Sequence, residues 1–153
     1  MAGVVSETLL AVRVAYNSFA FQESDDSAVP VPYNDAYVDG VFLTQHVRRF
    51  DVFSAGHTHT ADVLVRVWDG EPEETNGAWD EQGEVDFEST TGEVSIWSTT
   101  HGRSPDTIVL GSLGLWRVRV GCAGRDEVRR VTQQEGVAYG VEKYAVDFWP
   151  KAE

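Results

Sequence analysis

Hydrophobic and polar residues alternate at a period of two along most of this chain. The alternation is clearest in residues 116–120, where Trp and Val alternate with Arg, and it recurs in residues 62–67, 84–88, 93–96 and 143–148. It also occurs in residues 10–14, and we expect that run to continue through Tyr16 to Phe21. Alternation of this kind is typical of β-strands that turn one face toward a core and the other toward water. We therefore expect Val118 to face the core and Arg117 to face solvent.

Residue pairs typical of turns, such as Asp39–Gly40 and Thr91–Gly92, separate the alternating segments. About eight short strands at this spacing predict an all-β fold, an antiparallel two-sheet β-sandwich of jelly-roll-like or C2-like form. Only residues 35–38 and 127–134 have a pattern that allows a helical turn. Because 153 residues contain no repeat and no linker, we expect residues 1–153 to form a single domain.

The chain is strongly acidic, with 25 Asp and Glu against 12 Lys and Arg, which gives a net charge of −13. Such a charge disfavours direct binding to nucleic acid and to anionic membranes, and it attracts a basic protein partner. The asymmetry is local, because residues 1–100 hold 18 acidic and 4 basic residues, whereas residues 101–153 hold 7 and 8. The alternative is that the charge serves solubility alone.

Nine of the carboxylates lie in residues 69–88, a stretch without Lys or Arg. We expect residues 69–79 to form a long hairpin connection that leads into an edge strand, with Trp79 exposed as an anchor for a partner. The predicted partner-binding residues are Glu71, Glu73, Glu74, Trp79, Asp80, Glu81 and Glu84. A solvated, flexible loop is the alternative interpretation.

His57 and His59 are separated by one residue, so on a strand both imidazoles would point to the same face. This spacing is that of the first two ligands of a cupin metal site, and His101 is the candidate for the distant third ligand. The alternative is a pair of polar histidines in a turn.

No pattern in the sequence predicts catalysis or a cofactor. Ser98, Ser104 and Ser112 lack a Gly-x-Ser-x-Gly context, and there is no phosphate-binding Gly-rich motif. Cys122 is the only cysteine, so no internal disulfide can form, and its apolar context predicts a buried thiol. Without a signal peptide or an apolar run of about 20 residues, a cytoplasmic protein without membrane insertion is expected.

Several segments resemble the start and middle of the competence protein J family, in which small acidic proteins inhibit a DNA-entry nuclease. These segments are VRVAYNSFAFQ at 12–22, DGVFL at 39–43, residues 60–68, VSIW at 94–97 and LWRVRV at 115–120. Residues 124–126 and 144–150 are similar to the closing pattern of many small bacterial proteins. The resemblance spans about two-thirds of the chain, but residues 69–88 are longer than the family pattern.

Three functions follow as hypotheses. The first is a non-enzymatic acidic binding protein, an inhibitor or immunity partner of a basic protein such as a nuclease. The second is a small β-sandwich or cupin-like protein that binds a metal or small ligand through His57 and His59. The third is an accessory subunit of a larger assembly.

Overall fold

The computed structural model describes residues 2–30, 40–73, 79–136 and 138–151. It contains ten β-strands, one 3₁₀ helix and one α-helix. In chain order the elements are β1 (Val4–Val14), β2 (Ser18–Glu23), η1 (Asp26–Ala28), β3 (Leu43–His46), β4 (Arg49–Phe53), β5 (His59–Trp68), β6 (Glu81–Ser89), β7 (Glu93–Ser98), β8 (Gly102–Val109), β9 (Gly114–Ala123), α1 (Arg125–Glu135) and β10 (Tyr139–Pro150).

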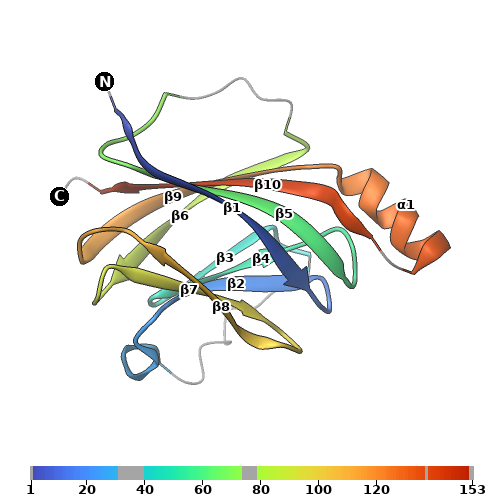
Figure 1. The fold of residues 1–153 in the computed structure, drawn as a ribbon, viewed down its shortest axis with the longest axis horizontal. Coiled ribbons are helices and arrows are strands. Elements are labelled where there is room, and N and C mark those ends of the chain that lie inside the picture. Colours follow the sequence, from blue (N-terminus) through green and yellow to red (C-terminus); the bar gives the residue numbers. More distant parts are fainter. Residues whose placement is uncertain (1, 31–39, 74–78, 137, 152–153) are drawn as a thin grey trace.

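The strands form two five-stranded sheets that face each other (Figure 1). Sheet A has the order β1-β5-β10-β9-β6 and sheet B the order β3-β4-β2-β7-β8. The all-β two-sheet prediction is confirmed, with two corrections. The strands number ten and not about eight, and β5 pairs with β10 in parallel, so sheet A is mixed and not wholly antiparallel. A parallel pair needs a long connection between its strands, which local alternation cannot reveal.

Five phenylalanines from both sheets form the centre of the core: Phe19, Phe21, Phe50, Phe87 and Phe148. The rings of Phe21 and Phe50 stack with centroids 4.9 Å apart, and Phe148 meets Phe87 edge to face at 6.2 Å. Val118 is fully buried between the sheets, as the alternation predicted. Interdigitation of the two inner faces is the usual way in which a sandwich excludes water.

A tight turn at Tyr16 and Asn17 separates β1 from β2 and carries the chain from sheet A to sheet B. Both residues have left-handed φ values, 55° and 61°, as the two central residues of a type I′ turn require. The Asn17 side chain donates to the Ser54 carbonyl at 3.1 Å and so holds the turn. The expected continuous strand through Tyr16 to Phe21 was therefore wrong, because no Gly or Pro marks this turn.

Helix α1 covers one end of the sandwich (Figure 1). Its fully buried Val128 packs with Ala55 and Ala138, and the chain leaves the helix at Gly136, whose φ is 75°. Residues 127–134, predicted as a helical turn, lie within this longer helix. The other predicted helical turn, residues 35–38, lies outside the described residues. No helix in the described part of the chain is long and apolar enough to span a membrane.

Candidate functional site

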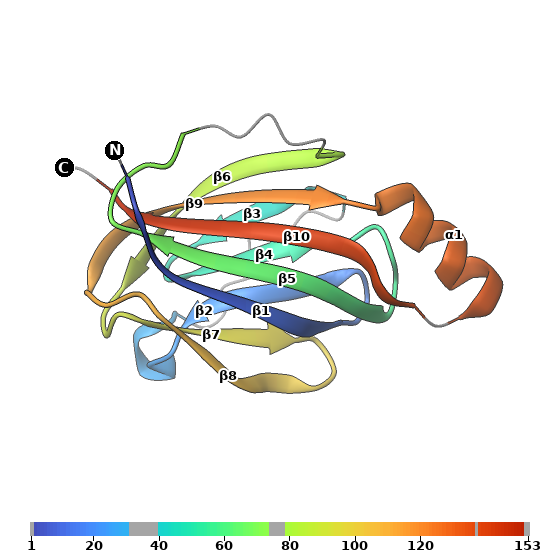
Figure 2. The same ribbon diagram turned by 45° about the horizontal axis from the view of Figure 1, so that its top comes forward.

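The two described ends of the acidic connection between β5 and β6, residues 69–73 and 79–80, lie on the outer face of sheet A. β5 and β6 belong to the same sheet, but β10 and β9 lie between them (Figure 2). Pro72, at the start of the connection, is buried, and its carbonyl accepts a hydrogen bond from Arg119 of β9 at 3.5 Å. The expected hairpin was therefore wrong, because a hairpin joins two neighbouring strands.

Trp79, near the end of the connection, is half-buried against Gly121 of β9. A Cβ atom at position 121 would lie 2.7 Å from the indole ring, so the contact requires glycine. Arg119, two residues earlier, is only 6% exposed, and its guanidinium carbon lies 4.9 Å from the ring centroid of Trp149. Trp79 was expected to be exposed, and the face of β9 that carries its arginines was expected to contact water. Both expectations were wrong, since Trp79 is half-buried and Arg119 is buried.

The predicted partner-binding carboxylates have three kinds of surroundings. Glu73 and Glu81 are exposed, and no ion pair joins them to another described residue. Glu71 is exposed, and its Oε2 lies 3.9 Å from Nη2 of Arg119. Asp80 is exposed and accepts a hydrogen bond from the Arg125 amide, at the start of α1. Glu74 lies outside the described residues.

Glu84 is engaged with arginines of its own chain. β6 pairs with β9, which places Glu84 and Asp86 opposite Arg119 and Arg117. Glu84 accepts hydrogen bonds from Arg117 at 3.1 Å and from Arg119 at 3.0 Å, while Asp86 accepts from Arg117 and Lys151. Burial alone would raise the pKa of Glu84, but the hydrogen bonds from Arg119 and Arg117 outweigh it and lower that pKa. Glu84 is thus less available to a partner than the sequence suggested.

The three histidines predicted as a metal site lie in different surroundings. His57 precedes β5, is exposed, and meets the ring of Tyr16 edge-on at 5.1 Å. His59 is buried, whereas His101 is exposed and accepts a hydrogen bond from Arg13 at 2.9 Å. Among the described residues, no group of three or more His, Cys, Asp or Glu is arranged to hold a metal ion. The expectation that His57 and His59 share a strand face was wrong, because β5 begins only at His59.

His59 belongs to a buried polar cluster that the sequence analysis missed. Its Nε2 lies 2.7 Å from the Ser54 hydroxyl, which donates to Oε1 of Glu142 at 2.6 Å. The same carboxylate accepts from the Tyr144 hydroxyl at 2.7 Å and from the Ala55 amide at 3.0 Å. These contacts join β10 to the connection between β4 and β5, and every hydrogen bond to the carboxylate compensates for its burial.

Ser54, His59 and Glu142 do not form a catalytic triad. In a triad the acid accepts a hydrogen bond from Nδ1 of the histidine, which orients the ring. Here Glu142 instead accepts from Ser54 and lies 3.5 Å from Nε2, while Nδ1 has no hydrogen-bond partner among the described residues. All three side chains are buried, so a substrate cannot reach the hydroxyl. The cluster is structural.

Cys122 is buried on the inner face of β9, as the sequence predicted. Burial, with a smaller contribution from Glu142, raises the pKa of its thiol to about 12. The nucleophilic thiolate is therefore almost absent near neutral pH.

Two solved structures share this fold. Over 99% of each chain, the protein superimposes on ComJ, inhibitor of the DNA degrading activity of NucA, from Bacillus subtilis, with a TM-score of 0.66 and 15% identity. It also superimposes on the product of crocagin biosynthetic gene J, over 97% of this chain and 100% of the other, with a TM-score of 0.62 and 12% identity. The resemblance to the competence protein J family is thus confirmed in the fold. No protein-family model and no curated protein sequence matches the chain.

Proposed function

We propose that the protein is a non-enzymatic inhibitor that binds a basic enzyme of the nuclease class, as an immunity protein does. The observation that carries this proposal is the match in fold, over almost the whole of both chains, to an inhibitor of DNA degradation. The net charge of −13 supports it, because a nuclease groove that binds polyphosphate must be basic and attracts an acidic domain.

The partner would bind at an acidic surface formed by Glu71, Glu73, Asp80 and Glu81. These residues are exposed, and they lie in the described ends of the connection and at the start of β6, an edge strand of sheet A. Trp79 contributes by holding the end of this connection on Gly121. Glu84 serves to keep Arg119 in place beneath it.

Inhibition is tested by measuring DNA degradation in a cleared lysate of the native host while the purified protein is added. Protein immobilised on a resin then captures its partner from the same lysate, and the captured fraction is assayed for DNA degradation before and after elution. We expect inhibition that saturates, and a captured nuclease whose activity appears on elution. If DNA degradation is unchanged at all concentrations and the captured fraction degrades no DNA, the proposal is wrong.

The acidic surface is tested in a triple variant, Glu71→Gln, Glu73→Gln and Glu81→Gln. Asp80 is left intact because it accepts a hydrogen bond from the first residue of α1. The association rate with the captured nuclease should fall, and its dependence on salt should become weaker. Thermal stability should stay nearly unchanged, because exposed charges contribute little to folding.

A matched control removes the same charge from other parts of the molecule, in the variant Glu7→Gln, Glu93→Gln and Glu135→Gln. These three residues are also exposed, and they lie in β1, β7 and α1. The control should associate at nearly the rate of the unmodified protein. Equal rates for the two triple variants would place the binding surface elsewhere and leave the inhibitory function standing.

A further inference from the structure

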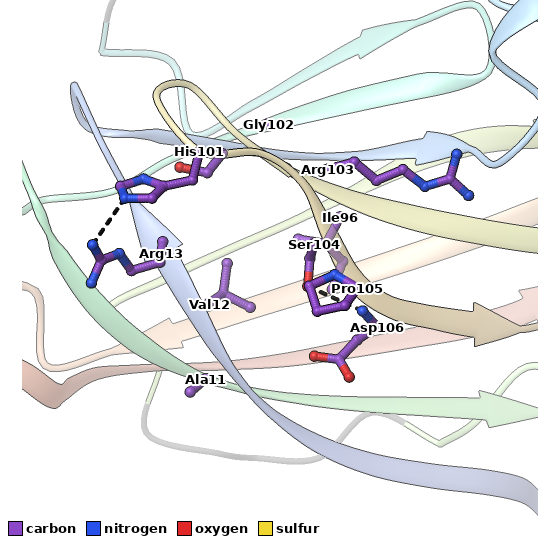
Figure 3. A pocket seen from close by; sticks show the side chains of 11 residues that line it. Ala11, Val12, Arg13, Ile96, His101, Gly102, Arg103, Ser104, Pro105 and Asp106 are labelled. Atoms are coloured by element: carbon purple, nitrogen blue, oxygen red, sulfur yellow. Dashed lines mark hydrogen bonds between the residues drawn. The ribbon is translucent and has the colours of Figure 1, made fainter.

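A cavity opens between the two sheets on the side formed by the edge strands β1 and β8 (Figure 3). Its volume is about 290 Å³. At the opposite side of the sandwich, the Gln45 side chain of β3 accepts a hydrogen bond from the Asp86 amide of β6 at 2.8 Å and so joins the two edge strands there.

The inner part of the cavity combines apolar side chains with the hydroxyl groups of two serines, Ser98 and Ser104. Val12 and Ile96 line it with side chains that are 5% and 1% exposed. Ser98 follows Ile96 at the next inward position of β7 and also lines the cavity. Its Oγ is buried and has no hydrogen-bond partner among the described residues. Buried hydroxyl groups are normally paired, so this one marks a place where a polar group fits.

Arg13 lies at one end of the cavity, beside His101 (Figure 3). Nine of the ten arginines have a carboxylate oxygen at 3.9 Å or closer within the described residues, and Arg13 is the exception. Its Nη2 lies 2.9 Å from Nε2 of His101, which must accept, because a guanidinium group can only donate. Arg13 is exposed, so its guanidinium group is open to an external anion.

The other end of the cavity has a negative group. Asp106 lies there, exposed, on the side away from Arg13 (Figure 3). Arg103, which also lines the cavity, directs its guanidinium group to the Ser24 carbonyl at 3.2 Å. The cavity thus has a positive end, a middle where Val12 and Ile96 supply apolar surface, and a negative end. A ligand with negative charges at both ends would be repelled by Asp106.

We propose that this cavity binds a small organic monocarboxylate, whose carboxylate pairs with Arg13 and whose short apolar chain lies on Val12 and Ile96. Guanidinium and carboxylate groups match in a two-pronged hydrogen-bonding geometry that an alcohol or an amine cannot reproduce. A volume of about 290 Å³ lies at the lower end of the range for ligand pockets, which suits a ligand of this size. The site is separate from the acidic surface, and its test needs no protein partner.

The test is a titration of the full ¹⁵N-labelled chain with sodium hexanoate, followed by amide NMR shifts. We expect saturable shifts at Val12, Arg13, Ile96 and Ser98. Hexanol and hexylammonium should bind at least tenfold more weakly, because neither pairs with Arg13. Adipate, which has a carboxylate at each end, should also bind more weakly, and the variant Asp106→Asn should reduce that difference.

The variant Arg13→Gln should weaken hexanoate binding at least tenfold. Arg129→Gln is the matched control, since Arg129 is exposed on α1 and its loss changes the net charge equally. Both variants are checked for an unchanged thermal midpoint, and Arg13→Lys, which keeps the charge without the planar group, should bind with intermediate affinity. Shifts that do not saturate, equal binding of hexanoate and hexanol, or equal affinities of the Arg13→Gln and Arg129→Gln variants would each overturn the proposal.

Discussion

The indole ring of Trp79 occupies the space that a side chain on Gly121 would need. A Cβ atom on Gly121 would lie within 3.0 Å of three atoms of the ring. The contact fixes the end of the acidic connection, just before β6, on the outer face of β9. The position of the proposed partner-binding carboxylates therefore depends on a glycine in a strand that carries none of them.

The variant Gly121→Ala should displace Trp79 into solvent and lower the free energy of unfolding by about 1–3 kcal/mol, as overpacking does. A red shift of tryptophan emission and a urea titration would detect the two effects. Gly70→Ala is the control, since the nearest atom to a Cβ at position 70 is the Cβ of Ala2, at 3.9 Å. Equal emission spectra for both variants would contradict the packing described for Trp79.

Glu23 should make stability depend on pH in the acid range. Its buried carboxylate accepts hydrogen bonds from Ser89, the Asp25 amide, Thr91 and the Thr90 amide. Burial alone would raise the pKa of Glu23, but these hydrogen bonds together lower it. The stabilisation is therefore present above the unfolded-state pKa of about 4.3 and is lost as the pH falls through the lower folded-state value.

Replacing Glu23 with Gln should accordingly lower the free energy of unfolding by about 2–3 kcal/mol at pH 7, since hydrogen bonds to a charged group are lost. The difference from the unmodified protein should shrink in strong acid. Urea titrations at pH 7 and pH 3 would measure it, with the exposed Glu7→Gln as control. A difference that is the same at both pH values would refute the role given to the carboxylate.

His59 should make stability fall as the pH drops below about 6.5. Burial lowers the pKa of His59, although Glu142 and the Thr60 backbone partly oppose it. The unfolded chain therefore takes up the proton first, and folding becomes weaker by up to about 1.4 kcal/mol per pH unit until the folded-state pKa is reached. The slope between pH 7 and pH 5 should decrease in His59→Gln and persist in His57→Gln, whose residue is exposed. Loss of the slope in His57→Gln, with the slope retained in His59→Gln, would show that His59 does not cause the pH dependence.

Replacing Val118 with Asp should prevent folding, because it places an unpaired carboxylate among fully buried residues. We expect a loss of about 4 kcal/mol or more. Circular dichroism and thermal melting would show it. Leu115→Asp, in the same strand at a position that is 47% exposed, should fold and melt cooperatively. A Val118→Asp variant that melts as Leu115→Asp does would mean that the faces of β9 are reversed.

The Cys122 thiol should react with Ellman's reagent only when the protein unfolds. The thiol is buried and its pKa is raised to about 12, so both access and thiolate are lacking at pH 8. The labelling rate in increasing urea should therefore follow the unfolding transition seen by fluorescence. Rapid labelling in the absence of urea would contradict the burial of β9.

Strand faces were predictable from the sequence because alternation is a local property. Val118 and Phe148 face the core as their neighbours in the pattern indicate. The same pattern also indicates two buried carboxylates. Glu23 follows Phe19 and Phe21 at an inward position, and Glu142 precedes Tyr144 at another. A carboxylate in phase with a core face must be buried and hydrogen-bonded or else unfold the strand.

Partners distant in the sequence were not predictable. The acidic stretch looked unbalanced because Glu84 and Asp86 meet Arg119 and Arg117 only after β6 pairs with β9. The turn at Tyr16 was missed because a two-residue left-handed turn usually contains Gly or Asn-Gly, and here a single Asn17 gives the only indication. The end of the cavity where we propose that a carboxylate binds likewise forms only when Arg13 and His101 meet, and these two residues are 88 positions apart in the sequence.

The place of β10 in sheet A has a consequence for synthesis on the ribosome. It is the last strand in chain order, yet it joins β5 to β9, and Tyr144 pairs with Val63 from the first half of the chain. All five strands of sheet B have emerged by Val109, whereas sheet A cannot join its two halves until residues up to Pro150 are available. During that interval the rings of Phe19, Phe21 and Phe50 lack their contacts with Tyr144 and Phe148 of β10. The nascent chain is therefore most exposed to aggregation, and most in need of a chaperone, just before β10 arrives.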